Sequence, residues 1–103
     1  MFFVNDKSSL RDTIQSLKLE GKSIGLVPTM GALHEGHLEL IRLAKADCQI
    51  VICSIYVNPT QFNNSTDLEK YPRNQEKDLL LLKKVGCDIA FCPTDELMYG
   101  DLS

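Results

Sequence analysis

The run from residue 49 to residue 57 is the feature that most constrains the fold of this chain. It is almost unbroken in apolar character, with the sequence Gln-Ile-Val-Ile-Cys-Ser-Ile-Tyr-Val. A strand that is apolar on both faces is typical of a central strand in a parallel sheet, because helices cover such a sheet on both sides. A strand at residues 23–27 and a helix at residues 36–46 precede it, which makes a right-handed strand–helix–strand unit. The sequence therefore predicts an α/β fold.

The rest of the chain continues this alternation. Residues 1–4 can form a short strand, and a helix follows from N-cap candidates at residues 6–9 to about residue 18. A helix at residues 74–85 and a strand at residues 88–92 come later, and residues 94–103 form a turn or short helix. The order β-α-β-α-β-α-β predicts a Rossmann-like, doubly wound parallel sheet. About four strands are counted where about five or six are usual, so the sheet is expected to be incomplete.

The segment after residue 27 is the candidate binding site. It carries Gly31, Ala32 and Gly36, and it ends where a helix begins, with His34 and His37 three residues apart. Ligands of open α/β sheets bind beyond the carboxyl ends of the strands, and a helix N-terminus attracts anions. Small residues also let a phosphate approach the backbone. We therefore expect a phosphate or nucleotide site at residues 30–37.

Two other interpretations of the histidines stay open at this point. His37, Leu40, Ile41 and Ala44 share one helix face, so both imidazoles are expected to look inward at the strand ends, where they could simply be satisfied core histidines. A zinc site is disfavoured, because His-Glu-Gly-His is one residue short of the His-Glu-x-x-His spacing.

The four cysteines raise the question of a metal site. They form two pairs with four residues between the members of each: Cys48 with Cys53, and Cys87 with Cys92. This spacing is not the usual zinc-knuckle arrangement with a glycine turn, and Cys53 and Cys92 lie inside apolar runs. We expect reduced, buried structural cysteines and no metal site.

Composition narrows the class of partner. The chain has 103 residues and a net charge of −3, without a block of Lys and Arg that would indicate a nucleic-acid or membrane surface. No segment is long enough to span a bilayer, and the N-terminus is too short and too soon acidic for a signal peptide. The sequence predicts a cytoplasmic protein with small-molecule ligands. Gln61, in the loop after the central strand, could recognise a polar substrate or could be an ordinary exposed loop residue.

Three blocks together carry a resemblance. They are Val-Pro-Thr-Met-Gly-Ala-Leu-His-Glu-Gly-His-Leu at residues 27–38, Val-Asn-Pro-Thr-Gln-Phe at residues 57–62 and Asp-Leu-Glu-Lys-Tyr-Pro-Arg at residues 67–73. In this order and spacing the chain resembles the pantoate–β-alanine ligase (pantothenate synthetase) family over nearly its whole length. The His-x-Gly-His block alone is shared with other nucleotidylyl-transfer enzymes.

The resemblance implies an activity and a set of site residues. The family condenses pantoate and β-alanine to pantothenate through a pantoyl adenylate, with ATP as substrate and Mg²⁺ as its companion. Gln61 matches the residue that contacts pantoate and β-alanine, and His37 matches the residue described as a proton donor. A homodimer is also implied. The residues implied to surround ATP are Met30, Gly31, Ala32, Leu33, His34, Glu35, Gly36 and His37.

The chain also departs from the family. Family members are considerably longer, with a further sheet segment that carries a Lys and a Gln, and a C-terminal domain with a Lys-Met-Ser-like loop. Residues 1–103 are therefore expected to be the N-terminal part of a Rossmann-like nucleotide-binding domain, without the C-terminal domain and inactive in isolation. The strand at residues 23–27 would then lack a neighbour, and unless residues 1–4 fill the gap, an open edge should promote self-association. The alternatives are another His-x-Gly-His nucleotidylyltransferase or a non-catalytic nucleotide-binding module.

Overall fold

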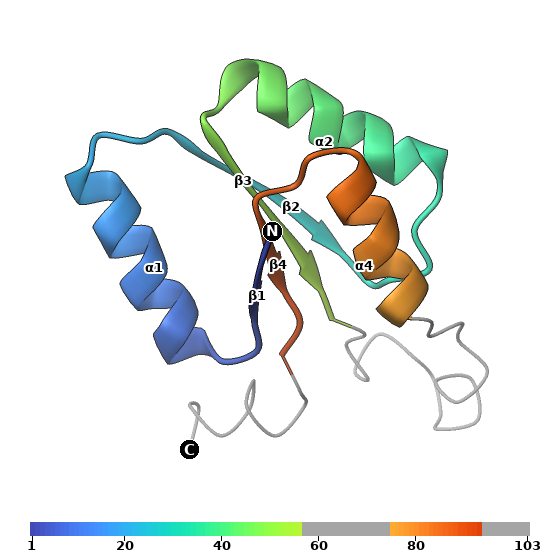
Figure 1. Ribbon diagram of the computed structural model, residues 1–103, viewed down its shortest axis with the longest axis horizontal. Helices are drawn as coiled ribbons and strands as arrows, with labels where there is room; N and C mark the ends of the chain where they lie inside the picture. The colour runs from blue at the N-terminus through green and yellow to red at the C-terminus, as the bar shows by residue number, and fades with distance from the viewer. Residues whose placement is uncertain (57–74, 94–103) are drawn as a thin grey trace.

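The predicted α/β alternation is confirmed. A computed structural model describes residues 1–56 and 75–93 and contains a parallel sheet in the order β1-β4-β3-β2 (Figure 1). The elements are β1 (Phe2–Val4), α1 (Lys7–Leu19), β2 (Ile24–Thr29), α2 (Glu35–Asp47), β3 (Ile50–Ile55), α4 (Gln75–Lys84) and β4 (Ile89–Phe91). The Asp6 side chain caps α1 by accepting a hydrogen bond from the Ser9 backbone N–H over 2.9 Å, as the N-cap prediction required.

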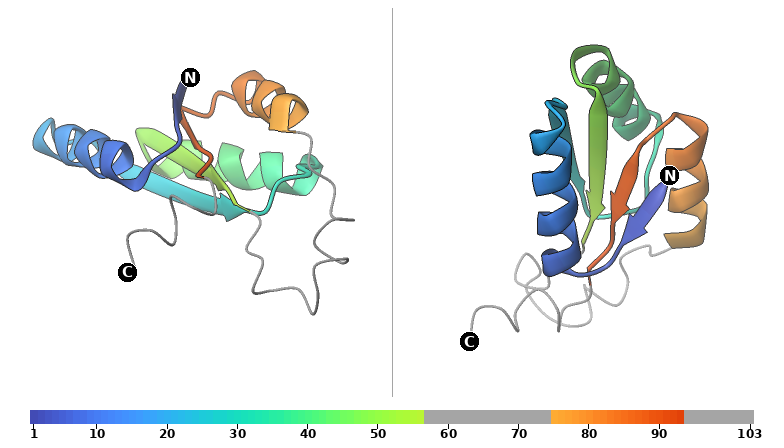
Figure 2. Two further views of the ribbon diagram at one scale, coloured as in Figure 1. Left: turned by 90° about the horizontal axis from the view of Figure 1, so that it is seen from below. Right: turned by 60° about the vertical axis from the view of Figure 1, so that its left-hand side comes forward.

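Helices cover both faces of the sheet, as a doubly wound fold requires. Figure 2 shows α1 on one face and α2 and α4 on the other. The central strand β3 serves both layers, because Val51, Cys53 and Ile55 join the α2–α4 core while Ile52 joins the α1 core. The α1 helix adds Leu10, Ile14 and Leu17 to its layer. The prediction of a central strand buried on both faces is therefore confirmed.

The β2 strand lies at an edge of the sheet, and β1 pairs with β4 at the opposite edge. Residues 1–4 therefore do not fill the place beside β2, and no other described strand does. The backbone N–H groups of Ile50 and Tyr56 donate to the carbonyls of Ser23 and Thr29, over 2.9 and 3.0 Å. Odd-numbered residues of β2 thus bond to β3, and the nitrogen of Pro28 faces the open edge. The strand can therefore include Pro28 without the loss of a ladder hydrogen bond, and it ends at Thr29, two residues beyond its predicted end at residue 27.

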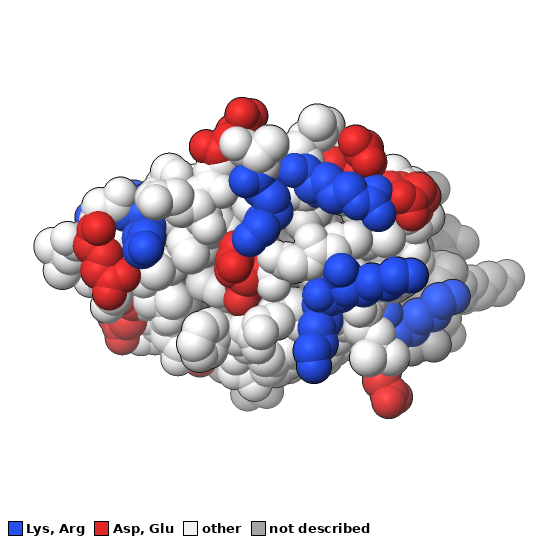
Figure 3. Space-filling model, turned by 45° about the horizontal axis from the view of Figure 1, so that its top comes forward, with Lys and Arg blue, Asp and Glu red and all other residues white. Residues whose placement is uncertain are grey.

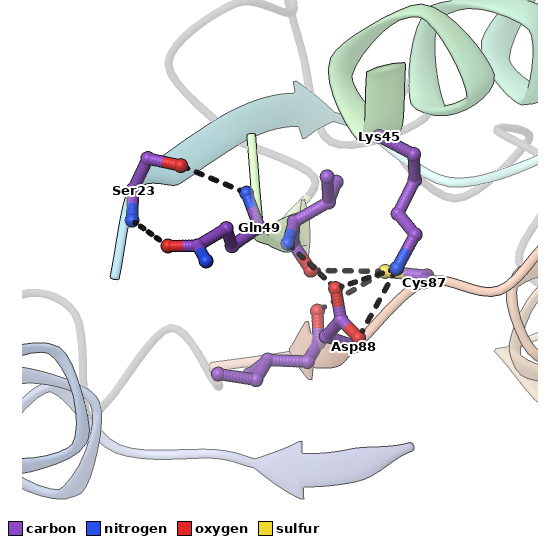
Figure 4. Close-up of polar contacts among 7 residues, drawn as sticks. Ser23, Lys45, Gln49, Cys87 and Asp88 are labelled. Carbon is purple, nitrogen blue, oxygen red and sulfur yellow. Dashed lines mark hydrogen bonds and ion pairs between the residues drawn. The ribbon is translucent and has the colours of Figure 1, made fainter. Parts of the chain in front are cut away.

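Polar side chains fix the register of three strands at their amino ends (Figure 4). The Gln49 backbone N–H donates to Ser23 Oγ over 2.8 Å, and the Ser23 backbone N–H donates to Gln49 Oε1 over 3.2 Å. Asp88 Oδ2 accepts from the Val51 backbone N–H over 2.8 Å and from Lys45 Nζ over 3.1 Å. These contacts hold β2, β3 and β4 together at the end of the sheet opposite the candidate site.

The predicted inward face of α2 is wrong at one residue, Leu40. Leu38 and Ile41 are buried and Ala44 packs on the core, whereas the Leu40 side chain is 53% exposed. Leu40 precedes Ile41 by one position, about 100° around the helix, so it turns away from the sheet when Ile41 points into it.

The outer face over α2 and α4 carries charges of both signs next to one another, as Figure 3 shows. Arg42 Nη1 pairs with Glu35 over 2.6 Å and with Glu39 over 3.1 Å. Both pairs are solvent-exposed, so they contribute little stability. Within the described residues, no helix has the length and apolar character that crossing a membrane requires.

The cysteines are mostly buried. Cys53, Cys87 and Cys92 are buried, Cys48 is half-buried, and none of the four forms a disulfide. Burial raises the pKa of Cys53 to about 12 and that of Cys92 to about 11. Among the described side chains, no group of three or more His, Cys, Asp or Glu residues could hold a metal ion. The expectation of buried thiols is confirmed for three of the four.

Candidate functional site

The loop from β2 to α2 leaves the carboxyl end of the edge strand through two left-handed residues. The φ angles are +89° at Gly31 and +52° at Ala32. At Gly31, an added Cβ would lie 3.3 Å from both Asp78 Oδ2 and Ile55 Cγ2, so glycine also allows a close approach to α4. At Ala32, the left-handed conformation costs roughly 1–2 kcal/mol, which the surrounding contacts must offset. The loop is therefore held in a shape that its own backbone preferences do not favour.

The contact that holds this loop comes from Asp78, a residue that the sequence did not single out. Its side chain is buried, with 3% exposure, in the first turn of α4. Oδ2 accepts from the Ala32 backbone N–H over 3.0 Å, and Oδ1 accepts from the Leu33 backbone N–H over 2.9 Å. The positive end of the helix dipole also favours a carboxylate at this position.

A weak sequence feature could have identified Asp78. It lies four residues before Leu82, which is fully buried. Residues four apart share a helix face. An Asp on an apolar stripe needs hydrogen-bond donors from elsewhere in the fold, because a buried carboxylate without partners is strongly destabilising.

The two histidines hydrogen-bond the start of α2. His34 is the N-cap, and its Nδ1 atom accepts from the Gly36 backbone N–H over 3.0 Å. His37 Nδ1 accepts from the His34 backbone N–H over 3.1 Å. The ring centroids are 4.2 Å apart at an interplanar angle of 48°. Because both Nδ1 atoms are acceptors, each neutral ring carries its proton on Nε2, which leaves an Nε2–H donor for a ligand.

The expectation that both imidazoles look inward is wrong for His34. Its side chain is exposed, while His37 is partly buried. The reason is the capping role, since an N-cap residue lies just outside the helix and keeps its side chain at the helix end. Burial lowers the pKa of His37 below its ordinary value of 6.5, the charge of His34 lowers it further, and the charge of Asp78 opposes both. The net effect favours the neutral form of His37.

Gly36 is what allows the His34 ring to lie over the helix start. A Cβ at this position would be 2.8 Å from His34 Cε1 and 3.1 Å from its Nδ1. Any larger residue would displace the ring. The glycine between the histidines therefore has a steric reason, in addition to the close phosphate approach that the sequence predicted.

Most backbone N–H groups of the loop already have acceptors, although the sequence predicts a phosphate or nucleotide site at this helix start. The Gly31 N–H donates to Thr29 Oγ1 over 3.3 Å, and those of Ala32 and Leu33 donate to Asp78. The N–H groups of His34 and Gly36 donate to the imidazoles. The loop is therefore preorganised by its own hydrogen bonds, and neither imidazole Nε2–H group has an acceptor among the described residues.

The predicted site residues fall into two groups. Residues 30–34 form the loop beyond the carboxyl end of β2, and residues 35–37 begin α2, so the segment lies between a strand and a helix start as predicted. Gln61 and the blocks at residues 57–62 and 67–73 lie outside the described residues. A parallel sheet with helices on both faces and a preorganised loop at its carboxyl edge defines a Rossmann-like α/β domain, the class in which ligands bind at this edge.

Sequence similarity to known proteins identifies the family of this chain. A model of the pantoate–β-alanine ligase family matches residues 3–102. A pantothenate synthetase of Christiangramia forsetii is 60% identical over 97 residues, which are 93% of this chain and 34% of that protein. One from Shouchella clausii is 50% identical over 101 residues, or 98% of this chain and 33% of that protein. The chain belongs to the pantoate–β-alanine ligase family.

Solved structures agree with this assignment. The ligase from Francisella tularensis, complexed with β-γ ATP and β-alanine, matches with a TM-score of 0.90 and 40% identity, over 98% of this chain and 38% of that one. The pantothenate synthetase of Thermus thermophilus matches with a TM-score of 0.78 and 38% identity, over 96% of this chain and 34% of that one. The chain spans about a third of the length of the curated relatives that it matches.

Proposed function

We propose that this chain supplies one wall of the active site of an ATP-dependent pantoate–β-alanine ligase. The observation that carries the proposal is the pair of Nε2–H donors, oriented by Nδ1 hydrogen bonds at the carboxyl edge of the sheet. Family membership supports it, as does the Francisella tularensis structure, which contains β-γ ATP and β-alanine.

The proposed reaction has two steps. The carboxylate of pantoate attacks the α-phosphorus of ATP, forming a P–O bond as the bond to the leaving pyrophosphate breaks. The amine of β-alanine then attacks the acyl carbon of the pantoyl adenylate and forms the amide C–N bond. AMP leaves with the electron pair of the C–O bond, and the nitrogen loses a proton to the solvent. In the first step, negative charge grows on the phosphate oxygens and on the pyrophosphate.

The histidines would stabilise that charge. Donors that are fixed before the reaction, and aimed at the developing charge, stabilise a transition state without reorganisation. The neutral state of His37 makes it a hydrogen-bond donor through Nε2–H, and this role needs no proton transfer. Mg²⁺ would enter with ATP, since phosphates and water supply most of its ligands, and it would neutralise phosphate charge.

The remaining parts of the site are also proposals. Residues 30–37 would surround ATP, and Gln61 would contact pantoate and β-alanine. Residues 1–103 would be the N-terminal part of the nucleotide-binding domain of a cytoplasmic enzyme, with the other wall supplied by sequence beyond this chain. The chain alone would then be inactive, because catalysis requires contacts that position the phosphates from both sides.

A chimera tests this function. This chain replaces the matching third of the Christiangramia forsetii relative, to which it is 60% identical. We expect the chimera to form pantothenate from ATP, pantoate and β-alanine, and the chain alone to form none. A folded but inactive chimera would contradict the proposal. Pyrophosphate release without pantoate would favour another nucleotidylyltransferase, and ATP binding without turnover would favour a non-catalytic module.

Gln61 is tested in the same chimera. With Gln61→Ala, we expect the KM for pantoate to rise while the affinity for ATP stays unchanged, because the loop after β3 would face the substrate rather than the phosphates. Steady-state kinetics measures the KM for pantoate, and isothermal titration measures the affinity for ATP. If the two ligands were affected equally, Gln61 would not belong to the pantoate site.

The open edge of β2 supports the proposal of a homodimer. Leu26 on this strand is 62% exposed, and its backbone N–H faces the edge. Exposed strand edges pair with other chains, although Pro28 shortens the stretch that can do so. Sedimentation equilibrium of the chain at tens of micromolar should show a dimer or a larger species. A monodisperse monomer would contradict the proposal.

A further inference from the structure

We propose that Asp78 is a positioning residue for the nucleotide site, whose buried carboxylate holds the loop that presents His34 and His37. This inference rests on the proposed function, because it assigns the loop to ATP. It concerns a residue of α4, far along the chain from the His-x-Gly-His block and on another element. Neither the resemblance nor the sequence pattern assigned this residue to the site.

The geometry of the carboxylate matches two consecutive backbone donors. Oδ2 lies 3.0 Å from the Ala32 nitrogen and Oδ1 lies 2.9 Å from the Leu33 nitrogen, so the carboxylate uses one oxygen for each. Ala32 is the residue with the unfavourable φ of +52°, and Gly31 beside it has a φ of +89°. The two hydrogen bonds therefore act where the backbone would otherwise relax to another conformation.

Burial of a carboxylate costs free energy, so its presence here indicates that Asp78 has a role other than packing. Asp78 is 3% exposed on a helix face that otherwise packs apolar side chains such as Leu82 against the sheet. A leucine or alanine could fill such a position without the desolvation of a carboxylate. The ion pairs within the described residues involve Arg42 and Lys45 but not Asp78. Among the described residues, the Asp78 carboxylate binds the backbone of the loop, at Ala32 and Leu33.

The loop connects Asp78 to the histidines directly. Leu33, held by Oδ1 and itself buried, immediately precedes His34. The His34 N–H then donates to His37 Nδ1, so a shift of Leu33 would change the contact that fixes the tautomer of His37. Among the described residues, the charges that act on His37 are those of His34 and Asp78, and the charge of Asp78 raises the pKa of His37. Asp78 thus acts on the histidine pair by position and by charge.

NMR of the 103-residue chain tests this role without catalysis. The sequence has only two histidines, so long-range ¹H–¹⁵N spectra report the tautomer and the titration of each ring without overlap. In Asp78→Asn, the amide keeps one acceptor oxygen and turns an NH₂ group toward the other backbone donor. We expect the Nδ1 resonance of His37 to lose its hydrogen-bonded position and its titration midpoint to fall, because the nearby negative charge is lost.

The matched control is Asp88→Asn. Asp88 is also a partly buried carboxylate that accepts a backbone N–H, that of Val51, but it lies at the opposite end of the sheet. We expect this variant to lower the melting temperature without a change in either histidine. If Asp78→Asn likewise lowers only the melting temperature and leaves both histidine signals as in the wild type, the positioning role is wrong.

The wild-type chain supplies a test that does not depend on a variant's folding. Amide hydrogen exchange at Ala32 and Leu33 should be slow, as expected for N–H groups bonded to a buried carboxylate. Exchange at the rate of an unstructured peptide would overturn the proposal. These NMR results stand even if the ligase function fails.

In the active chimera, the kinetic effect should be large. A displacement of about 1 Å can lower turnover about 100-fold, so Asp78→Asn should lower kcat by about that factor with little change in the KM for pantoate. An unchanged kcat in an active Asp78→Asn chimera would contradict the positioning role while leaving the function intact.

Discussion

His37 Nδ1 accepts the backbone N–H of His34 over 3.1 Å, so one side chain caps the helix and presents a donor at the same time. The hydrogen bond uses Nδ1 and leaves Nε2–H for a ligand. The structural and functional contributions of His37 therefore reside on different atoms of the ring. A substitution that keeps an acceptor near the position of Nδ1 and removes Nε2–H separates them.

In the chimera, His37→Ala should lower the adenylation rate by about 100-fold or more, as expected for loss of one transition-state donor. His37→Gln is the matched variant, because a Gln at this helix position can accept the N-cap N–H without providing an imidazole. We expect both variants to lose activity, and His37→Gln to keep the wild-type melting temperature. Near-normal turnover with a large drop in melting temperature would instead show that His37 is a structural histidine.

Gly36→Ala should weaken ligand binding with little net change in stability. Alanine favours a helix over glycine by about 1 kcal/mol, but its methyl group would lie 2.8 Å from His34 Cε1, so the ring must move and its capping hydrogen bond, worth about as much, is lost. We expect a nearly unchanged melting temperature and a weaker affinity for ATP, measured by differential scanning calorimetry and isothermal titration. Wild-type affinity in a folded variant would show that the position of the His34 ring is not needed.

The pH dependence of stability follows from His37. Its pKa in the folded chain lies below the ordinary value of 6.5, first because of burial and second because of His34. The unfolded chain therefore binds more protons than the folded chain as the pH falls through 6.5 toward the folded pKa. The contribution of His37 to stability is therefore fully present above pH 6.5. It is lost as the pH falls from 6.5 through the pKa of His37 in the folded chain. Urea titrations at a series of pH values measure this loss.

The matched variants for this pH effect are His37→Gln and His34→Gln. His37→Gln should remove the part of the pH dependence that belongs to His37. His34→Gln should raise the pKa of His37 toward its ordinary value, because a like charge is lost. A lower pKa of His37 in His34→Gln would contradict the coupling between the rings.

The cysteines should differ in reactivity with iodoacetamide. Burial raises the pKa of Cys53 to about 12 and that of Cys92 to about 11, so both are thiols rather than thiolates at pH 8. Cys87 is also buried with a raised pKa, whereas Cys48 is half-buried. Mass spectrometry should find Cys48 modified first in the folded chain and all four modified in urea. Early modification of Cys53 would contradict the burial of β3.

The local features of this fold were predictable from the sequence. The apolar run at residues 49–57 identified the central strand, and the N-cap candidates at residues 6–9 located the start of α1, because both patterns depend on neighbours within a few residues. The same holds for residues 30–37, where the glycines and the paired histidines follow one strand directly. Periodicity and capping are local properties, so the sequence alone determined the order of the elements and the position of the candidate loop.

Contacts between distant segments were decided only by the tertiary structure. The sequence left open whether residues 1–4 pair beside residues 23–27, and the structure places β1 beside β4 instead. Leu40 was assigned inward, because periodicity does not fix the rotation of a helix on its sheet. Asp78 accepts hydrogen bonds from a loop that lies more than forty residues earlier in the chain. Strand pairing, helix rotation and the partners of buried polar groups all depend on packing between segments that are distant in the sequence. This packing exists only once the sheet and its helices are assembled.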